Sequence, residues 1–151
     1  MNSLELRIPP PVVALFFALL MWLASLPFAL PIPFAYRVGV AIALVIVGLG
    51  LRVSGMVSFR RARTTMNPVR PGATSLVRSG VYRLTRNPMY LGWTLKLLGW
   101  AMFLASPLAL LLVPLFMLYI RRFQIEPEER VLSSLFVGEY SQYSEKVRRW
   151  L

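Results

Sequence analysis

Residues 97–120 read LLGWAMFLASPLALLLVPLFMLYI, which is 24 consecutive positions without a charge. This stretch suits either one kinked membrane helix or two arms that turn at Ser106-Pro107, because the residue before a proline avoids helical backbone angles. A single helix would place the two most basic segments of the chain on opposite sides of a membrane, whereas basic loops gather on the cytoplasmic side. We therefore expect a helical hairpin with arms at residues 88–105 and 108–123.

The rest of the chain is apolar as well. Hydrophobic residues make up 57% of the 151 positions and charged residues 15%, and the mean hydropathy is +0.61, which exceeds what a soluble domain of this size needs for its core. Residues 8–36 add 29 positions without a charge, more than the roughly 20 needed to cross a bilayer. The sequence predicts an all-α integral membrane protein of one domain with about four transmembrane helices, the first two at residues 11–30 and 35–56.

Within this domain we distinguish a first helix pair (1–57), a basic interfacial loop (58–87), the helical hairpin (88–123) and a C-terminal tail with cytoplasmic amphipathic helices (124–151). Of the 17 basic residues, eight lie in or beside the loop and six lie in the tail or just before it. This clustering predicts that both termini and the functional site are cytoplasmic. It also accounts for the net charge of +11 through contact with anionic membrane lipids. No nucleic-acid reading motif is present.

Some chemistry is excluded by composition. The chain has no cysteine, no histidine and no aspartate, so disulfides, thiolate chemistry and an imidazole base are absent, and a carboxylate-rich metal cage is not expected. Five of the six glutamates lie in the tail. Pro127 suits the first position of a helix, which would place Glu128 and Glu129 in a first turn where the helix dipole stabilises negative charge. That role alone would account for both carboxylates.

Two motifs flank the predicted hairpin. Arg86-Asn87-Pro88-Met89-Tyr90-Leu91-Gly92 precedes its first arm, and Glu128-Glu129 follows its second. A hairpin brings its two ends to one membrane surface, so a basic and aromatic turn would face a carboxylate pair. Such a site suits a small zwitterionic cofactor.

Four motifs in order carry a resemblance to a known family: Ser79-Gly80-Val81-Tyr82, residues 86–92, Glu128-Glu129-x-x-Leu132 and Tyr140-x-x-Tyr143. Together they resemble the isoprenylcysteine carboxyl methyltransferase family, and the related phospholipid N-methyltransferases share much of this C-terminal plan. The resemblance covers residues 79–150, nearly half of the chain. It implies an integral membrane enzyme without a soluble Rossmann domain that uses S-adenosylmethionine to methylate a lipophilic or lipidated acceptor at the membrane face.

The resemblance also implies residue roles. Arg86 or Arg122 would pair the cofactor carboxylate or an acceptor carboxylate, and Glu128 or Glu129 would take the cofactor ammonium or ribose hydroxyls. Arg122 and Glu129 are the expected catalytic residues. The full set expected to bind the cofactor is Tyr82, Arg86, Asn87, Pro88, Tyr90, Leu91, Gly92, Glu128 and Glu129.

Lys96 and Arg122 are the expected substrate-binding residues. Lys96 falls in the middle of the third predicted helix, where an ammonium facing lipid is costly. We therefore expect it to face a cavity, a partner or a helix interface, where it would line the acceptor path, or to extend its side chain to the membrane interface from a short helix.

One position departs from the family pattern, because Asn87 stands where the family usually has histidine. Asparagine cannot accept a proton near neutral pH. A carboxylate acceptor needs no base, whereas an amine acceptor must first be deprotonated, so Asn87 favours a carboxylate or a thiolate acceptor. Two alternatives stay open: a phospholipid N-methyltransferase, and a non-catalytic basic membrane protein that binds anionic lipid. The acceptor and the oligomeric state are not determined by the sequence.

Overall fold

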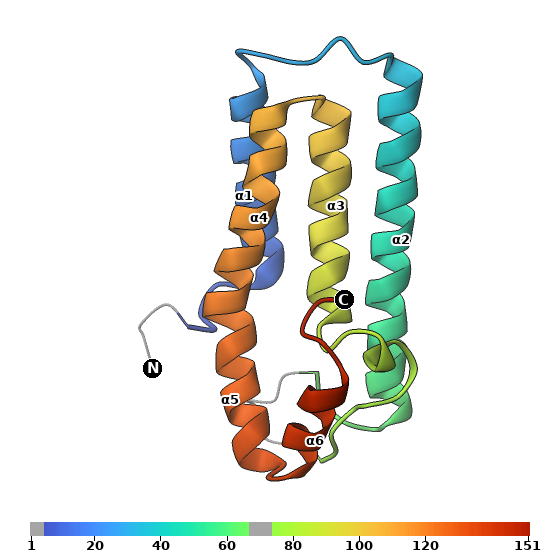
Figure 1. Cartoon of the computed structure of the whole chain (residues 1–151), viewed down its shortest axis with the longest axis vertical. Coiled ribbons are helices and arrows are strands. Elements are labelled where there is room, and N and C mark those ends of the chain that lie inside the picture. The colour runs from blue at the N-terminus through green and yellow to red at the C-terminus, as the bar shows by residue number, and fades with distance from the viewer. Residues whose placement is uncertain (1–4, 67–73) are drawn as a thin grey trace.

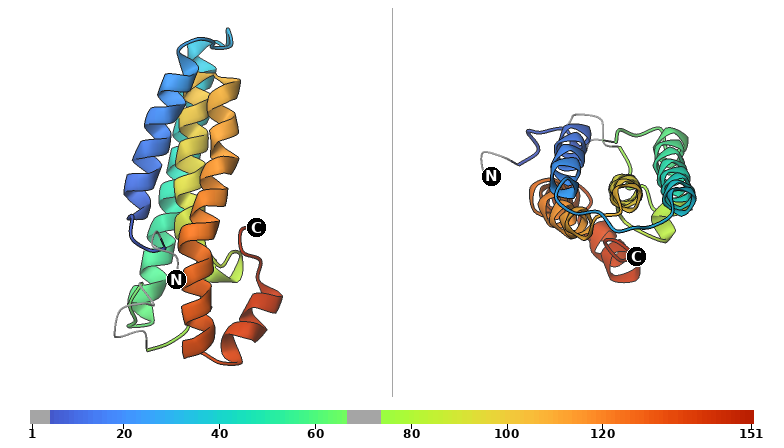
Figure 2. Two further views of the ribbon diagram at one scale, coloured as in Figure 1. Left: turned by 90° about the vertical axis from the view of Figure 1, so that its left-hand side faces the viewer. Right: turned by 90° about the horizontal axis from the view of Figure 1, so that it is seen from above.

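The computed structural model describes residues 5–66 and 74–151, and every regular element in these ranges is helical. Long helices run side by side as a bundle (Figure 1). Seen from its end, α3 lies between α2 on one side and α1 with α4 on the other (Figure 2). The helices of the bundle are α1 (Pro10–Ser25), α2 (Phe34–Arg61), α3 (Pro88–Leu104) and α4 (Pro107–Ile120).

Shorter elements gather at one end of the bundle. A 3-10 turn, η1 (Gly80–Arg83), precedes α3. A π-helical turn, η2 (Arg121–Ile125), joins α4 to α5 (Glu126–Leu135), and α6 (Glu139–Lys146) folds back beside α5 (Figure 1). This end carries the motif residues 86–92.

The predicted hairpin is confirmed. Ala105 adopts left-handed backbone angles with φ 51° and ends α3. The Ser106 hydroxyl then accepts a hydrogen bond from the Ala109 N–H at 3.5 Å, and Pro107 occupies the first position of α4. The turn therefore uses a side-chain cap and a proline at a position where no N–H is needed.

The ends of the first two helices differ from the prediction. The first helix stops at Ser25 rather than at residue 30, because prolines at positions 27, 31 and 33 favour an extended connection. The second helix extends to Arg61, past the predicted end at residue 56. Its last turn holds Arg60 and Arg61, whose positive charges suit a helix C-terminus.

The prediction that a new helix starts at Pro127 was wrong. Ile120 and Glu126 both have φ −61° and ψ −41°, and the chain is helical without a break from Pro107 to Leu135. The wider π turn accommodates Pro127, which has no N–H to donate and whose ring would clash within a regular α-helix. Glu128 and Glu129 therefore lie far from a free helix N-terminus, and the helix dipole does not explain them.

The bundle has a small core and a broad apolar exterior. Met21, Phe116, Ile120 and Ile125 are fully buried between the helices. Large apolar residues on the outer faces of α1, α2 and α4 are exposed, and α2 and the helix 107–135 are each long and apolar enough to span a membrane. Such a surface is typical of helices in lipid. That α1 and α3, with 16 and 17 residues, also span the bilayer stays a prediction.

Glycines bring α2 and α3 into close contact. A Cβ added to Gly92 would lie 2.5 Å from the carbonyl oxygen of Gly48, and one added to Gly99 would lie 3.0 Å from the carbonyl oxygen of Ala41. The two backbones approach because neither position carries a side chain. We call this contact, formed by Ala41 and Gly48 of α2 with Gly92 and Gly99 of α3, the α2–α3 seam. It holds the start of α3, where the candidate site lies, against α2.

Candidate functional site

An apolar cavity of about 90 Å³ lies at the basic end of the bundle, between α2, η1, the start of α3, α5 and α6. Its wall includes the apolar side chains of Phe59, Met89, Ile125 and Leu132. Six of the nine residues expected to bind the cofactor also line it: Tyr82, Arg86, Asn87, Tyr90, Glu128 and Glu129. The fold therefore brings the two motifs that flank the hairpin to one site.

The other expected site residues lie outside the cavity lining. Pro88 and Leu91 are buried at the start of α3, and Gly92 packs against α2. The Arg122 guanidinium is half exposed and contacts Glu126 at 3.5 Å, and also the buried Glu5. Arg122 thus helps to hold the N-terminal segment to α5.

Glu128 is the carboxylate that points into the cavity. Its Oε1 accepts a hydrogen bond from the Tyr90 hydroxyl at 2.7 Å. Its carboxyl group is enclosed, and burial raises its pKa to about 7, with a further contribution from the charge of Glu129 and opposed by the hydrogen bond from Tyr90. A carboxyl group with this pKa can exchange a proton near neutral pH.

Tyrosines form the wall beside Glu128. The Tyr143 hydroxyl donates to the carbonyl oxygen of Tyr82 at 2.7 Å, which ties α6 to η1. The Tyr82 ring meets Phe59 edge to face, with centroids 5.5 Å apart. Burial raises the pKa of Tyr82 above its ordinary value, so its hydroxyl stays protonated.

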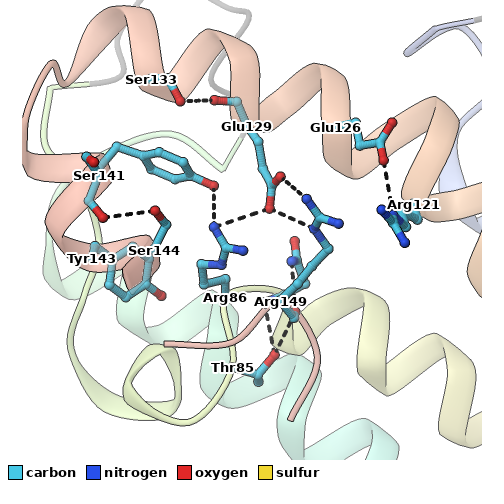
Figure 3. A network of polar contacts seen from close by, with 12 residues as sticks. Thr85, Arg86, Arg121, Glu126, Glu129, Ser133, Ser141, Tyr143, Ser144 and Arg149 are labelled. Atoms are coloured by element: carbon cyan, nitrogen blue, oxygen red, sulfur yellow. Dashed lines mark hydrogen bonds and ion pairs between the residues drawn. The ribbon is translucent and has the colours of Figure 1, made fainter. Parts of the chain in front are cut away.

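Glu129 lies where the cavity meets a network of charges, and its carboxylate takes part in that network (Figure 3). Its Oε1 lies 3.5 Å from the Arg86 Nη1, and its Oε2 lies 2.6 Å from the Arg149 Nη2. Arg86 Nη1 also donates to the Tyr140 hydroxyl at 3.2 Å. Arg86 Nε is buried and has no hydrogen-bond partner among the residues that the structure describes, so within that part of the chain this guanidinium retains an unused donor.

A second, open cleft of about 630 Å³ lies on the outer side of this network. Arg86, Glu129 and Tyr140 line both the cleft and the cavity. The Arg86–Glu129 ion pair therefore separates an apolar cavity from a polar cleft that opens to solvent.

The last residues of the chain cross over the start of α3. The Arg86 N–H donates to the Arg148 carbonyl at 3.0 Å. The Thr85 hydroxyl and the Asn87 side-chain amide donate to the Arg149 carbonyl at 3.2 and 3.0 Å. Asn87 thus fixes the C-terminal segment with its amide group.

Sequence reasoning missed Arg149, and it used Tyr140 and Tyr143 as a motif without including them among the expected site residues. Arg149 is one of several arginines in a basic tail, and nothing in the local pattern distinguishes it from the others. The spacing of Tyr140 and Tyr143 placed them on one face of α6, and both are buried against the site, so that spacing was a usable signal.

Comparison with known proteins identifies the family. Residues 36–138, about two thirds of the chain, match the phospholipid methyltransferase family. An uncharacterized protein of Haemophilus influenzae is 51% identical over 63 residues, which are 42% of this chain and the whole of that protein. The matched family covers the broader group to which the sequence motifs point, whereas the isoprenylcysteine subfamily stays a prediction. With its apolar helices and the motifs gathered at one end of the bundle, the chain belongs to the phospholipid methyltransferase family of membrane methyltransferases.

Proposed function

We propose that the protein methylates the amine headgroup of a membrane lipid and takes the methyl group from S-adenosylmethionine. The observation that carries this proposal is the enclosed Glu128 carboxyl group, held by Tyr90 inside an apolar cavity. An amine acceptor needs a base, and the family histidine is replaced by Asn87. Glu128 supplies a base at a different position.

The residues present fit the cofactor. S-adenosylmethionine, when bound, supplies an activated methyl group on a cationic sulfur. Arg86, with its unused buried Nε, suits the cofactor carboxylate, and Glu129 suits the cofactor ammonium. Tyr82 and Tyr140 present ring faces beside them.

Binding requires the Arg86–Glu129 pair to separate. The cavity of about 90 Å³ is smaller than the roughly 300 Å³ at the lower end for small-molecule sites. Opening the pair would join it to the cleft of about 630 Å³. Each residue would then exchange one ionic partner for another, which avoids leaving a buried charge unpaired.

Glu128 then has a defined role in the transfer. Its carboxylate accepts a proton from the headgroup ammonium, and the freed nitrogen lone pair forms the bond to the methyl carbon. The electron pair of the breaking carbon–sulfur bond stays on sulfur. The apolar cavity lowers the pKa of the ammonium by desolvation and so brings it closer to that of Glu128.

A carboxylate acceptor is the second candidate, because Asn87 and the Arg86 guanidinium suit a substrate that needs no base. A substrate carboxylate placed beside Glu128 would meet a like charge whenever Glu128 is ionised. This repulsion disfavours a carboxylate acceptor relative to an amine acceptor.

The test uses full-length protein in lipid nanodiscs and compares phosphatidylethanolamine with a lipidated carboxylate as acceptor. We expect methylation of the amine with a rate that rises with pH through about 7, and a loss of about 10²–10⁴-fold in Glu128→Gln. Glu145→Gln removes an exposed carboxylate on α6 and should leave the rate unchanged.

Binding of S-adenosylhomocysteine, measured by calorimetry, provides a readout independent of turnover. Glu129→Gln should abolish micromolar binding, whereas Glu128→Gln should retain it within a few-fold. Methylation of the carboxylate lipid alone would overturn the amine proposal. Absence of saturable binding to folded wild type would favour the non-catalytic lipid-binding alternative.

A further inference from the structure

Two cations share one aromatic ring on the outer face of the α2–α3 seam. The Arg52 Cζ lies 4.7 Å and the Lys96 Nζ lies 3.4 Å from the centre of the Trp93 ring. All three side chains are partly exposed. The seam itself holds them together, because Gly92 lies next to the Arg52 Cβ and Gly48 lies next to the Lys96 Cγ.

No carboxylate neutralises these cations. In residues 5–66 and 74–151, neither Arg52 nor Lys96 takes part in an ion pair. A cation–π contact compensates only part of the cost of an unpaired cation on an apolar surface. Two cations side by side also repel each other. An anion with several acceptor oxygens would interact favourably with both cations, and a phosphate group has that chemistry.

Arg37, a third cation on the same helix pair, has a hydrogen-bond acceptor in addition to an aromatic ring. It lies near the other end of α2, its Nε donates to the Phe103 carbonyl at 2.6 Å, and its guanidinium lies 5.5 Å from the Phe103 ring centre. Arg37 thus contacts both an aromatic ring and a hydrogen-bond acceptor. Arg52 and Lys96 contact the Trp93 ring, and within the described part of the chain neither donates to an oxygen acceptor.

The two cations lie deeper in the bundle than the cavity, on the same faces of α2 and α3. Arg52 precedes the cavity residue Phe59 by seven positions, and Lys96 follows the cavity residue Met89 by seven, so each backbone position lies about two turns from the cavity. Both side chains contact the ring of Trp93, which lies about one turn from the cavity lining on α3. A ligand held beside this ring would therefore lie near the cavity.

Beyond the cations, the surface of α2 is apolar. Ile46 and Leu49 precede Arg52 on α2, farther from the cavity, and are 63% and 47% exposed. Along α2 the order is therefore an apolar surface, a cation pair and then the cavity with Glu128. A phospholipid has the matching order of acyl chains, phosphate and headgroup amine.

We propose that Arg52 and Lys96 bind the phosphate of the acceptor phospholipid and so direct its headgroup amine to Glu128. This inference rests on the proposed function, and it assigns two residues outside the family motifs to acceptor recognition. Trp93 holds the two cations in place and limits their access to solvent.

The test measures binding of short-chain lipids to detergent-purified full-length protein by calorimetry, without cofactor. The ligands are dihexanoylphosphatidylethanolamine, dihexanoylglycerol, which lacks the phosphate, and inorganic phosphate. The variants are Arg52→Gln and Lys96→Gln, and Arg37→Gln is the matched control because it removes a ring-bound cation from the same helix pair.

We expect each of the first two variants to weaken phosphatidylethanolamine binding by about tenfold, the size of one charge-assisted hydrogen bond. Dihexanoylglycerol should bind weakly and equally to all variants, and Arg37→Gln should bind like wild type. In methylation assays, Lys96→Gln should raise the KM for the lipid with little change in kcat or in S-adenosylhomocysteine affinity.

Equal binding of phosphatidylethanolamine to wild type and Lys96→Gln would overturn the phosphate subsite, even if methylation proceeds. Inorganic phosphate that binds as tightly as the lipid and with the same Arg52 dependence would overturn the lipid assignment. Lipid binding that depends on both cations, in a protein that methylates no amine, would support the subsite and contradict the proposed function instead.

Discussion

Adjacent residues can have opposite environments, and Glu128 and Glu129 illustrate this at the scale of single side chains. One helical step of 100° turns Glu128 into the cavity toward Tyr90 and Glu129 outward to Arg86 and Arg149. The sequence predicted that both carboxylates lie at the site, and it gave the catalytic role to Glu129 and not to Glu128. The contacts of α5 with the start of α3 and with the C-terminal segment separate a carboxyl group bonded to a tyrosine from one paired with arginines.

Glu128 makes stability depend on pH. Its folded-state pKa of about 7 lies above the ordinary value, so the folded protein holds its proton more tightly than the unfolded chain does. The contribution of Glu128 to stability is therefore fully present below about pH 4.5 and falls as pH rises through about 7, by about 3 kcal/mol for a shift of this size. Glu128→Gln should remove this decline, measured as the apparent melting temperature in mild detergent at several pH values.

The control for this measurement is Glu145→Gln, which removes an exposed carboxylate and should preserve the decline. The chain has no histidine, so few other side chains titrate between about pH 5.5 and 7. An unchanged pH profile in Glu128→Gln would show that the enclosed carboxyl group does not have a raised pKa.

At the scale of helices, local signals predicted some boundaries and missed others. The hairpin turn at Ser106-Pro107 was predictable because a helix cap and a proline affect the backbone only within their own turn. Pro127 misled the prediction because the π turn that accommodates it depends on tertiary packing of the buried Gln124 and Ile125. The motif residues of the site were predictable from their spacing. The partner of Arg149 was not, because Glu129 lies 20 residues away on α5.

The α2–α3 seam gives a prediction at the same scale. Gly92→Ala would place a Cβ 2.5 Å from the Gly48 carbonyl oxygen, and since neither backbone can yield without moving its helix, we expect a loss of about 1–3 kcal/mol. Gly50→Ala is the matched control, because that position faces open space and the change should stabilise the helix by up to about 1 kcal/mol. Thermal unfolding in detergent compares the two, and a Gly92→Ala protein as stable as wild type would contradict the close seam.

The whole molecule gathers its functional groups and both described chain ends at one end. The Arg130 Nη2 lies 2.6 Å from the Glu5 Oε2, which ties the N-terminal segment to α5. The C-terminal residues are bonded to the start of α3 through Arg86 and Asn87. The opposite end, formed by residues 26–33 and the turn after α3, contains no charged residue. This asymmetry predicts that the site end faces the cytoplasm.

Cysteine labelling tests that orientation, because the chain has no native cysteine. Phe28→Cys lies at the uncharged end, where the native side chain is 55% exposed, and Ser141→Cys lies on an exposed position of α6 at the site end. In cells that express the protein, a membrane-impermeant maleimide should label Phe28→Cys directly and Ser141→Cys only after permeabilisation. The reverse pattern would place the site outside the cell and contradict the orientation predicted from the basic clusters. Labelling of both cysteines from one side would mean that α1 and α2 enter and leave through the same surface, so the four-helix bundle would not span the membrane.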